Sequence, residues 1–397
     1  NTKSEDYIIQ MYSFNQRRNL RMKAYIITGS AGLLGSRLSH LLLQKGHIVV
    51  GIDNNSREKF FGKRGSVESN LEKLKNYENY YHITSSILDE DLLYKVSSVL
   101  DSLKFDTLHF VHSAAQPAHD YPTRGFKERL EDFRINGEGT LRMLELYREL
   151  KANGIFVHIS TDKVYGYHSI DIPLVETHSR FTPKDPHFKG FTEETPLDKS
   201  SKSFFGTSKL VGDLYAQEYF YQHDLPIVIF RSNCITGYSP TGVPLHGFLS
   251  YLVRALFIEG EYTINGYKGK QVRVSIDADI YSKIIDHVID NFKGFDIYNI
   301  ACLPKYSHSI LEAIGYLLKK PADENLLNSE IEFKGKKIKV NYREQPRHYD
   351  YKFNIYDLTK LTTHYPVTKE FLEENTLDYM FNNIFSSYGL NYEEIRR

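Results

Sequence analysis

The sequence predicts an α/β protein whose larger part is a doubly wound parallel sheet, followed by a smaller lobe towards the C-terminus. From about residue 22 to about residue 230, short apolar runs alternate with segments whose apolar residues recur at helical spacing, the pattern of β-α-β units. A glycine-rich turn, residues 29–35, directly follows the first apolar run. Beyond residue 231 the pattern loosens into shorter elements. A chain of 397 residues is long enough to give both parts a core.

The glycine-rich turn, Gly29-Ser-Ala-Gly-Leu-Leu-Gly35, lies between a strand expected at residues 24–28 and a helix expected at residues 38–45. A second strand, residues 47–52, ends on Asp53, about 20 residues after the turn, as in the dinucleotide-binding fingerprint of the Rossmann fold. Glycines let the backbone approach a pyrophosphate, and the helix N-terminus stabilises its charge. We expect Asp53 to bind both ribose hydroxyls of adenosine and to repel a 2′-phosphate, which favours NAD over NADP.

The remaining elements are expected in chain order. A polar excursion over residues 54–79 is too long for a routine connection, so a functional role is predicted for it. Strands are expected at 107–113 and 155–159, helices at 126–150, 205–221 and 245–258, and a loop at 171–202. The predicted organisation is an N-terminal tail or extension at residues 1–21, a dinucleotide-binding domain at 22–235 and mainly a substrate-binding lobe at 236–397.

Composition excludes several classes of protein. Lys plus Arg and Asp plus Glu number 50 each, so no global basic field points to nucleic acid or to an anionic membrane. No apolar run approaches the roughly 20 residues that span a bilayer, and residues 1–21 contain no apolar signal-peptide core. Cys234 and Cys302 have no paired spacing and are expected to be buried core thiols of a reducing compartment. The histidines form no convincing ligand set, so we expect no metal site. Because a membrane-spanning run and a signal-peptide core are both missing, we expect a cytoplasmic protein.

Two further motifs follow the expected strand at residues 155–159. They are Ser160-Thr-Asp-Lys-Val-Tyr-Gly166 and Ser203-Phe-Phe-Gly-Thr-Ser-Lys209. With the glycine turn and His112-Ser-Ala-Ala115, they resemble the extended short-chain dehydrogenase/reductase family (NAD-dependent epimerases and dehydratases) over nearly all of the chain from Met22. The segments 53–57, 61–62, 65–67, 112–120, 163–166, 245–248 and 266–273 look like the CDP-paratose/CDP-tyvelose 2-epimerase subgroup.

This resemblance implies a reaction and a set of partners. NAD would lie at the carboxyl edge of the sheet, and a nucleotide-diphosphate sugar would lie beneath the C-terminal lobe. The enzyme would invert C2 of a CDP-linked hexose or deoxyhexose through a transient ketone, supplying a sugar for a cell-surface polysaccharide. In the family, helices matching residues 126–150 and 205–221 pair across a two-fold axis, so a homodimer or higher homo-oligomer is expected.

The resemblance also assigns roles to individual residues. Thr161 matches the residue that hydrogen-bonds the sugar oxygen losing its proton, and Lys209 matches the lysine that binds the nicotinamide ribose. The pair Asp162-Lys163 stands where 4,6-dehydratases have Asp-Glu, and the lysine argues against a dehydratase. The implied catalytic residues are Thr161, Asp162, Lys163 and Lys209. The implied cofactor-binding residues are Gly29, Ala31, Gly32, Leu33, Leu34, Gly35, Asp53, Asn54, Asn55, Arg57, Ser86, Ile87, Ala114, Ala115, Gln116 and Lys209. The implied substrate-binding residues are Gln116, His119, Thr161, Asn233, His246, Arg273 and Arg343.

One departure from the family pattern bears on the chemistry. The family's catalytic tyrosine, four residues before the lysine, is here Phe205, which can neither accept nor donate a proton. Three hypotheses follow. Another group acts as the base (Lys163, Asp162, His119 or Tyr121), the chemistry differs from plain alcohol oxidation, or the chain binds NAD without catalysis. Other nucleotide-sugar 4-epimerases, reductases or dehydratases of the same fold stay open as alternatives.

Overall fold

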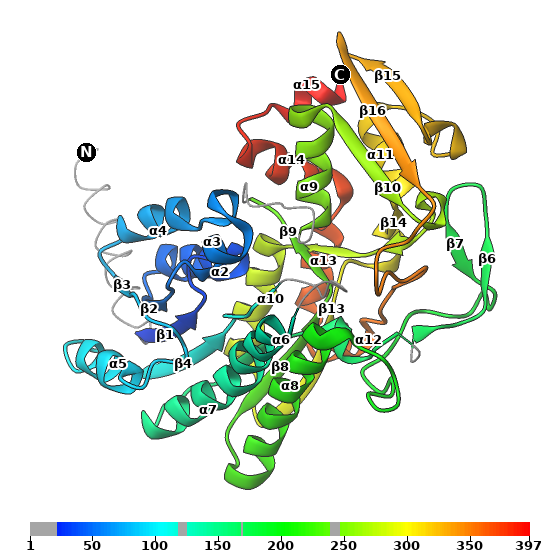
Figure 1. Cartoon of the computed structure of the whole chain (residues 1–397). Helices are drawn as coiled ribbons and strands as arrows, with labels where there is room; N and C mark the ends of the chain where they lie inside the picture. Colours follow the sequence, from blue (N-terminus) through cyan, green and yellow to red (C-terminus); the bar gives the residue numbers. More distant parts are fainter. Residues whose placement is uncertain (1–21, 118–124, 168–169, 239–246) are drawn as a thin grey trace, which may run out of the picture.

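A seven-stranded sheet forms the centre of the computed structural model, which describes residues 22–117, 125–167, 170–238 and 247–397 (Figure 1). The strand order is β13-β8-β5-β4-β1-β2-β3, and all neighbouring strands are parallel. The strands are β1 (Lys23–Thr28), β2 (Ile48–Ile52), β3 (Tyr80–Ile83), β4 (Thr107–His112), β5 (Phe156–Thr161), β8 (Ile227–Ser232) and β13 (Phe295–Ile300). The chain runs outward from β1 to β3 and then returns to β4 on the other side of β1. This reversal is the switch point at which such folds bind ligands, and the predicted fold class is confirmed.

Helices cover both faces of this sheet, which explains why its strands read as continuous apolar runs. On β1, Ile27 belongs to the core shared with α2 (Leu33–Gln44), α4 (Glu68–Lys75) and α10 (Ala278–Asn291). Its neighbour Ile26 belongs to the opposite core, shared with α5 (Leu92–Leu100), α7 (Gly139–Glu149) and α8 (Ser203–His223). Both side chains are fully buried.

The C-terminal lobe has a separate core. It contains α9 (Phe248–Arg254), the π-helical turn η5 (Ala255–Glu259), β10 (Glu261–Asn265), α11 (Ile310–Leu318), β15 (Ser329–Phe333), β16 (Lys336–Arg343), α14 (Leu377–Ser387) and α15 (Tyr392–Arg396). β10, β16 and β15 form a three-stranded sheet in that order. Leu252, Ile314 and Phe381 are fully buried in this core.

The chain passes between the two parts more than once. After β9 (Cys234–Thr236), α9 and β10 belong to the C-terminal lobe, but β12 (Ser275–Asp277) returns to pair with β9. α10 and β13 then complete the main sheet, and α12 (Thr359–His364) and α13 (Val367–Glu374) pack against β13 and α10. Residues 236–397 therefore do not form one continuous lobe.

The long connections contain regular structure of their own. The excursion at residues 54–79 contains α3 (Ser56–Phe61), η1 (Lys63–Gly65) and α4, and residues 126–150 form α6 (Phe126–Phe133), η2 (Arg134–Glu138) and α7. The loop at 171–202 carries the hairpin β6 (Leu174–Glu176) and β7 (Phe181–Pro183). The short elements η3 (Asp162–Val164), η6 (Tyr267–Gly269), β11 (Val272–Arg273), η7 (Pro304–Tyr306), β14 (His308–Ser309) and η8 (Glu324–Leu326) complete the fold. Within the described ranges, no helix has the length and apolarity needed to cross a bilayer.

Candidate active site

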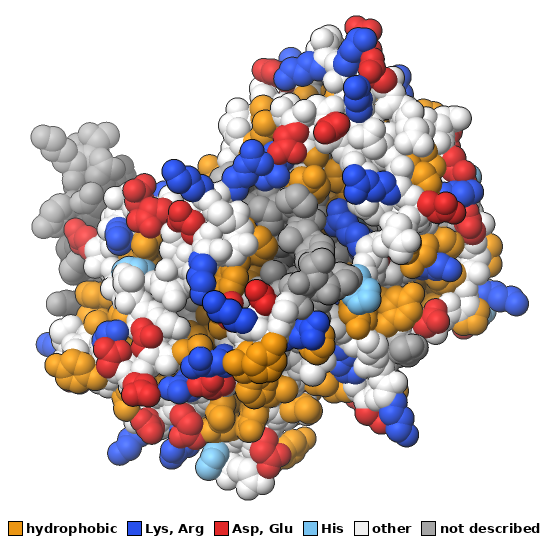
Figure 2. Space-filling model, viewed as in Figure 1, with side chains coloured by type: hydrophobic (Ala, Val, Ile, Leu, Met, Phe, Trp, Pro, Cys, Tyr) orange, Lys and Arg blue, Asp and Glu red, His pale blue; other side chains and the backbone are white. Residues whose placement is uncertain are grey.

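A cavity of about 1480 Å³ follows the carboxyl ends of β1, β2, β4, β5 and β8 and extends to the C-terminal lobe. Its wall is built from the glycine turn, the start of the 54–79 excursion, α6, the ends of β5 and β8, the first turn of α8, α9 and residues 345–354. Figure 2 shows a hollow on this face, with several Lys and Arg side chains around it. The cavity therefore lies at the switch point, where the topology predicts a ligand.

The glycine turn is packed so closely against neighbouring backbone that side chains at Gly29 and Gly35 would clash with it. Gly29 has φ of +68°, and a Cβ there would lie 3.0 Å from Cα of Ala114. A Cβ on Gly35 would lie 2.1 Å from the Gly29 carbonyl oxygen. Gly32, at the N-cap of α2, has no side chain that would cap the helix, so the first turn of α2 can present backbone N–H groups to a pyrophosphate. Gly29, Gly32, Leu33 and Leu34 line the cavity, whereas Ala31 and Gly35 lie behind it.

Asp53 is held rigidly at the cavity wall. Its Oδ2 accepts a hydrogen bond from the Ala31 N–H at 3.0 Å, and its Oδ1 accepts one from the Asn55 N–H at 2.8 Å. Burial raises the pKa of this carboxyl group, and the two backbone donors act against that rise. A carboxylate fixed at the end of β2 suits the two hydroxyls of an adenosine ribose. Asn54, Asn55 and Arg57 line the cavity next to it.

The end of the cavity near β3 is lined by Ser86 and Ile87, and Ala114 and Ala115 line the wall after β4. The Ser86 hydroxyl accepts a hydrogen bond from the Leu88 N–H at 3.2 Å, which leaves its hydrogen for another acceptor. Gln116 differs from these residues, because it is fully buried and its backbone N–H donates to Asn136 Oδ1 at 2.9 Å. Gln116 does not line the cavity.

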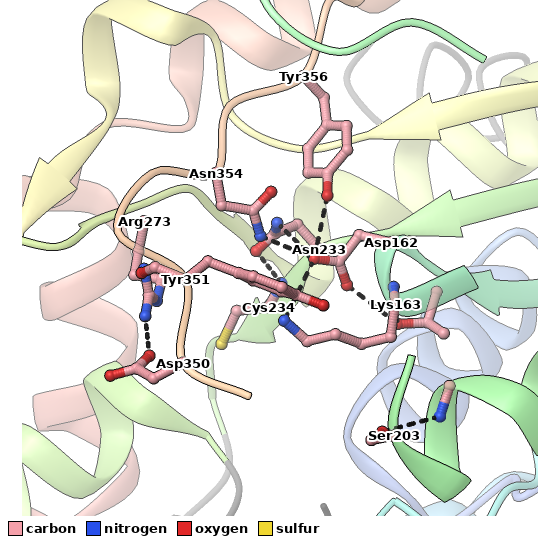
Figure 3. Close-up of polar contacts among 12 residues, drawn as sticks. Asp162, Lys163, Ser203, Asn233, Cys234, Arg273, Asp350, Tyr351, Asn354 and Tyr356 are labelled. Atoms are coloured by element: carbon pink, nitrogen blue, oxygen red, sulfur yellow. Dashed lines mark hydrogen bonds and ion pairs between the residues drawn. The ribbon is translucent and has the colours of Figure 1, made fainter. Parts of the chain in front are cut away.

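Asp162, directly after β5, is the centre of a polar cluster (Figure 3). Thr161 Oγ1 donates to Asp162 Oδ1 at 3.0 Å. The second oxygen, Oδ2, accepts from Asn354 Nδ2 at 2.8 Å, Asn233 Nδ2 at 3.1 Å and the Tyr356 hydroxyl at 3.3 Å. Both oxygens are thus engaged by donors of the chain, as burial of a carboxyl group requires. Asn233 also lines the cavity.

Lys163 lies beside this carboxylate with its amine at the cavity wall. Its Nζ is 3.7 Å from Asp162 Oδ2 and 3.9 Å from the centre of the Tyr351 ring. Among the described residues, Nζ has no hydrogen-bond partner, and the Lys163 N–H is the donor to Thr161 Oγ1 at 3.3 Å. Burial lowers the pKa of the amine, Arg273 adds to this, and Asp162 acts against it. A lowered pKa moves the amine towards its neutral form, which can accept a proton.

Lys209, on α8, is the second buried amine of the cavity. Its Nζ donates to the Ile159 carbonyl at 2.6 Å, and burial lowers its pKa to about 8. Phe205 lies one turn earlier on α8, is 7% exposed and lines the same wall. The side chain at this position is therefore an apolar ring that cannot exchange a proton.

Basic residues predominate around the cavity. Within the described part of the wall, eight Lys or Arg residues face four Asp or Glu residues, although the whole chain has a net charge of zero. Arg273 is one of them, but an ion pair with Asp350 engages it, and it donates to the Tyr351 carbonyl at 2.6 Å. Arg343 is exposed at the end of β16 and does not line the cavity, whereas Arg347 does.

Several predicted residues lie elsewhere or outside the described ranges. His119, His246 and Tyr121 lie outside the described residues. Cys302 is buried as expected, but the expectation for Cys234 is wrong, because this thiol is partly exposed and lines the cavity. Within the described ranges, no group of three His, Cys, Asp or Glu residues could hold a metal ion.

The sequence did not indicate the segment Asp350–Tyr356. It supplies two donors to Asp162, the ring next to Lys163 and the carboxylate paired with Arg273. Asn354 is 192 residues from Asp162 in the chain. The only local signal is the alternation of aromatic residues from Tyr349 to Tyr356, which resembles an ordinary buried strand.

Comparisons with known proteins place the chain among enzymes. The model of the NAD dependent epimerase/dehydratase family matches residues 25–301. CDP-paratose 2-epimerase of Salmonella typhi is 30% identical over 262 residues, which cover 64% of this chain and 71% of that protein. dTDP-glucose 4,6-dehydratase of Escherichia coli is 28% identical over 286 residues, or 69% of this chain and 71% of that protein.

Solved structures share the fold. UDP-glucuronic acid 4-epimerase of Bacillus cereus, in complex with UDP-glucuronic acid and NAD, superposes with a TM-score of 0.63 at 23% identity, covering 90% of this chain and 99% of that one. An epimerase of Methanothermobacter thermautotrophicus superposes with a TM-score of 0.68 at 20% identity, covering 96% of each chain. By its sequence match and its fold, the chain belongs to the NAD dependent epimerase/dehydratase family, whose cofactor is NAD.

Proposed function

We propose that this protein is a nucleotide-sugar epimerase that inverts C2 of a CDP-linked hexose or deoxyhexose through a transient ketone. The observation that carries the proposal is Lys163, which lines the cavity with its amine 3.7 Å from Asp162 Oδ2, at a position where a dehydratase has an acidic residue. The 30% identity to a CDP-paratose 2-epimerase supports the same assignment.

The glycine turn, Asp53 and Lys209 are the residues that would hold NAD. When bound, NAD supplies a group that accepts a hydride from a carbon and returns it. The pyrophosphate would lie at the N-terminus of α2, and Asp53 would hold the adenosine ribose. The Lys209 amine, fixed by the Ile159 carbonyl, would donate to the other ribose.

Lys163 is the residue best suited to exchange a proton with the sugar hydroxyl. In its neutral form the amine takes the hydroxyl proton as the ketone forms, and it returns that proton when the ketone is reduced from the other face. Asp162 is less suited, because Thr161, Asn233, Asn354 and Tyr356 all donate to its oxygens. Asp162 therefore stabilises the protonated amine and holds Thr161 in place.

The charge of the cavity suits two diphosphates at once. The diphosphate groups of NAD and of a nucleoside-diphosphate sugar together carry about four negative charges at neutral pH. In the described wall, Lys and Arg residues outnumber Asp and Glu residues by eight to four. Arg273, in β11, and Arg347, after β16, line this wall, and a guanidinium group binds phosphate oxygens in a bidentate manner.

Proton NMR of the purified protein with CDP-glucose and CDP-paratose in deuterium oxide tests the reaction. A new anomeric signal without deuterium at C2 is expected, because the same hydride returns. Deuterium at the inverted carbon would mean deprotonation chemistry and would contradict the proposal. Retained NAD without turnover of any CDP-, UDP- or dTDP-sugar would favour a binding protein, the hypothesis that Phe205 raises.

The variant Lys163→Met tests the role of the amine. We expect turnover to fall by at least about 100-fold while NAD content stays unchanged. Lys104→Met is the matched control, since Lys104 is exposed in the connection before β4, at the opposite edge of the sheet. Unchanged turnover in Lys163→Met would refute the assignment of the base.

We also propose that two copies associate through α6 and α8. Exposed apolar side chains gather on these helices: Phe126, Leu130, Phe133, Phe204, Leu214, Tyr215 and Tyr221. Contiguous apolar surface of this kind marks an interface. Light scattering coupled to size-exclusion chromatography tests this, and a monomer at micromolar concentration would contradict it.

A further inference from the structure

Tyr351 makes an unusual contact for a buried tyrosine. It is 3% exposed, and the Lys163 amine lies 3.9 Å from the centre of its ring (Figure 3). Its hydroxyl has no hydrogen-bond partner among the described residues. The contact with the Lys163 amine is therefore made by the face of the ring and not by the hydroxyl.

The ring is fixed from several directions. Tyr167 stacks against it with 5.4 Å between ring centres and 28° between planes. The Tyr351 carbonyl accepts from Arg273 Nη1 at 2.6 Å, which anchors the backbone at the same residue. A ring held in this way presents a constant face to the amine, and an aromatic face attracts a cation, most strongly where water is excluded.

We propose that Tyr351 is a positioning residue for Lys163, whose ring holds the amine at the cavity wall and favours its protonated form. The inference rests on the proposed function, in which Lys163 exchanges a proton with the sugar hydroxyl. It adds a residue beyond the segment 25–301 that the family model matches. The ring offsets part of the lowering of the Lys163 pKa that burial causes, so that the amine remains able both to take and to return a proton.

Four other groups act on this amine. Asp162, Asp350 and the Cys234 thiol favour its protonated form, whereas Arg273 disfavours it, and burial is the largest influence. All four remain when the ring is removed. Without the ring, less would offset the destabilisation of the charged amine by burial, and the pKa of Lys163 would fall.

Two variants separate the ring from the hydroxyl. Tyr351→Leu removes the aromatic face, and Tyr351→Phe keeps it while removing the hydroxyl that has no partner. In Tyr351→Leu, the acidic limb of the kcat profile is expected to move to lower pH by about half to one and a half units, the shift that a buried cation–π contact supplies. KM is expected to change less than threefold. Tyr351→Phe is expected to keep the wild-type profile.

A second measurement does not depend on turnover. The NAD-bound protein, without sugar, is labelled with acetic anhydride over a range of pH, and mass spectrometry of the peptide containing Lys163 gives the pKa of its amine. The same downward shift is expected in Tyr351→Leu alone. If the shift occurs but no sugar is converted, Tyr351 acts as inferred and the proposed function is wrong.

Equal pKa values in the three proteins, or equal shifts in both variants, would overturn the inference. Circular dichroism and NAD content show whether each variant is folded. If Tyr351→Leu does not fold, Tyr351→Met takes its place, because methionine fills a similar space with a flexible apolar chain. Its expected shift, and the result that overturns the inference, are the same.

Discussion

Removal of the Asp213 carboxylate should destabilise the protein more than the loss of any surface ion pair. Asp213 lies on α8, and its side chain is fully buried against Arg231, which is 2% exposed. Arg231 donates to it through Nε at 3.1 Å and Nη2 at 3.0 Å, and Ser160 Oγ donates at 2.7 Å. The Asp213 carboxylate raises the pKa of the guanidinium, although burial alone would lower it.

The variant Asp213→Ala leaves the guanidinium buried without its counter-charge. Breaking a buried pair by removing one partner costs about 3 to 5 kcal/mol. A chain of this size has an unfolding entropy of about 0.8 kcal/mol/K, so the melting temperature should fall by about 4 to 6 °C. Because the chain has no tryptophan, the melting curve is measured by circular dichroism. NAD is kept saturating for every variant, since ligand occupancy also stabilises the fold.

Two further variants test the reasoning. Replacing both partners with apolar residues, Asp213→Leu with Arg231→Met, should recover most of the loss, since no charge is then left unpaired. Glu330→Gln removes the pair with Lys337, whose side chains are 45% and 76% exposed, and should change the melting temperature by less than about 1 °C. A loss in Asp213→Ala no larger than that of Glu330→Gln would refute the reasoning.

Two other outcomes are expected. Gly35→Ala would place a Cβ 2.1 Å from the Gly29 carbonyl oxygen, so the NAD content of the purified protein, measured by absorbance after acid release, should fall at least tenfold. In the control Gly32→Ala, the Cβ would lie 3.1 Å from the same oxygen, and less NAD should be lost. Equal losses in the two variants would contradict the clash. The Lys209 amine has a pKa of about 8 in the fold and about 10.4 when unfolded, so the unfolded state binds more protons between these values and stability rises with pH there. The free energy of unfolding of the wild type and of Lys209→Met is measured by urea titration from pH 8 to pH 10.5. Relative to the variant, the wild-type value should rise by at most about 3 kcal/mol over this range. A parallel pH dependence of the two proteins would contradict the assignment.

The sequence was sufficient for the part of the site that parallel strands assemble. The glycine turn after β1, Asp53 after β2, Ala114 after β4 and Thr161 at the end of β5 were each predicted at a strand end. Carboxyl ends of parallel strands meet at one edge of the sheet, so position in the chain translated directly into position in the cavity.

The remainder depended on contacts that local patterns do not encode. β13 pairs with β8 through Phe295 and Ile227, and its apolar alternation alone does not reveal which strand it joins. Cys234 has apolar neighbours in sequence, yet the cavity opens next to its thiol. Asn354 and Tyr356 contact Asp162 only because the chain returns there after crossing the C-terminal lobe.

The return of Asp350–Tyr356 to the site has a consequence for protein synthesis. A ribosome releases the glycine turn and the first five strands long before residue 350 is made, and domains begin to fold as they emerge. During that interval Asp162 lacks two of its donors, and Lys163 lacks the ring beside it. A nascent or prematurely terminated chain would carry the glycine turn and Asp53 without these contacts of Asp162 and Lys163. The glycine turn and Asp53 would then be in place well before the surroundings of Asp162 and Lys163 are complete.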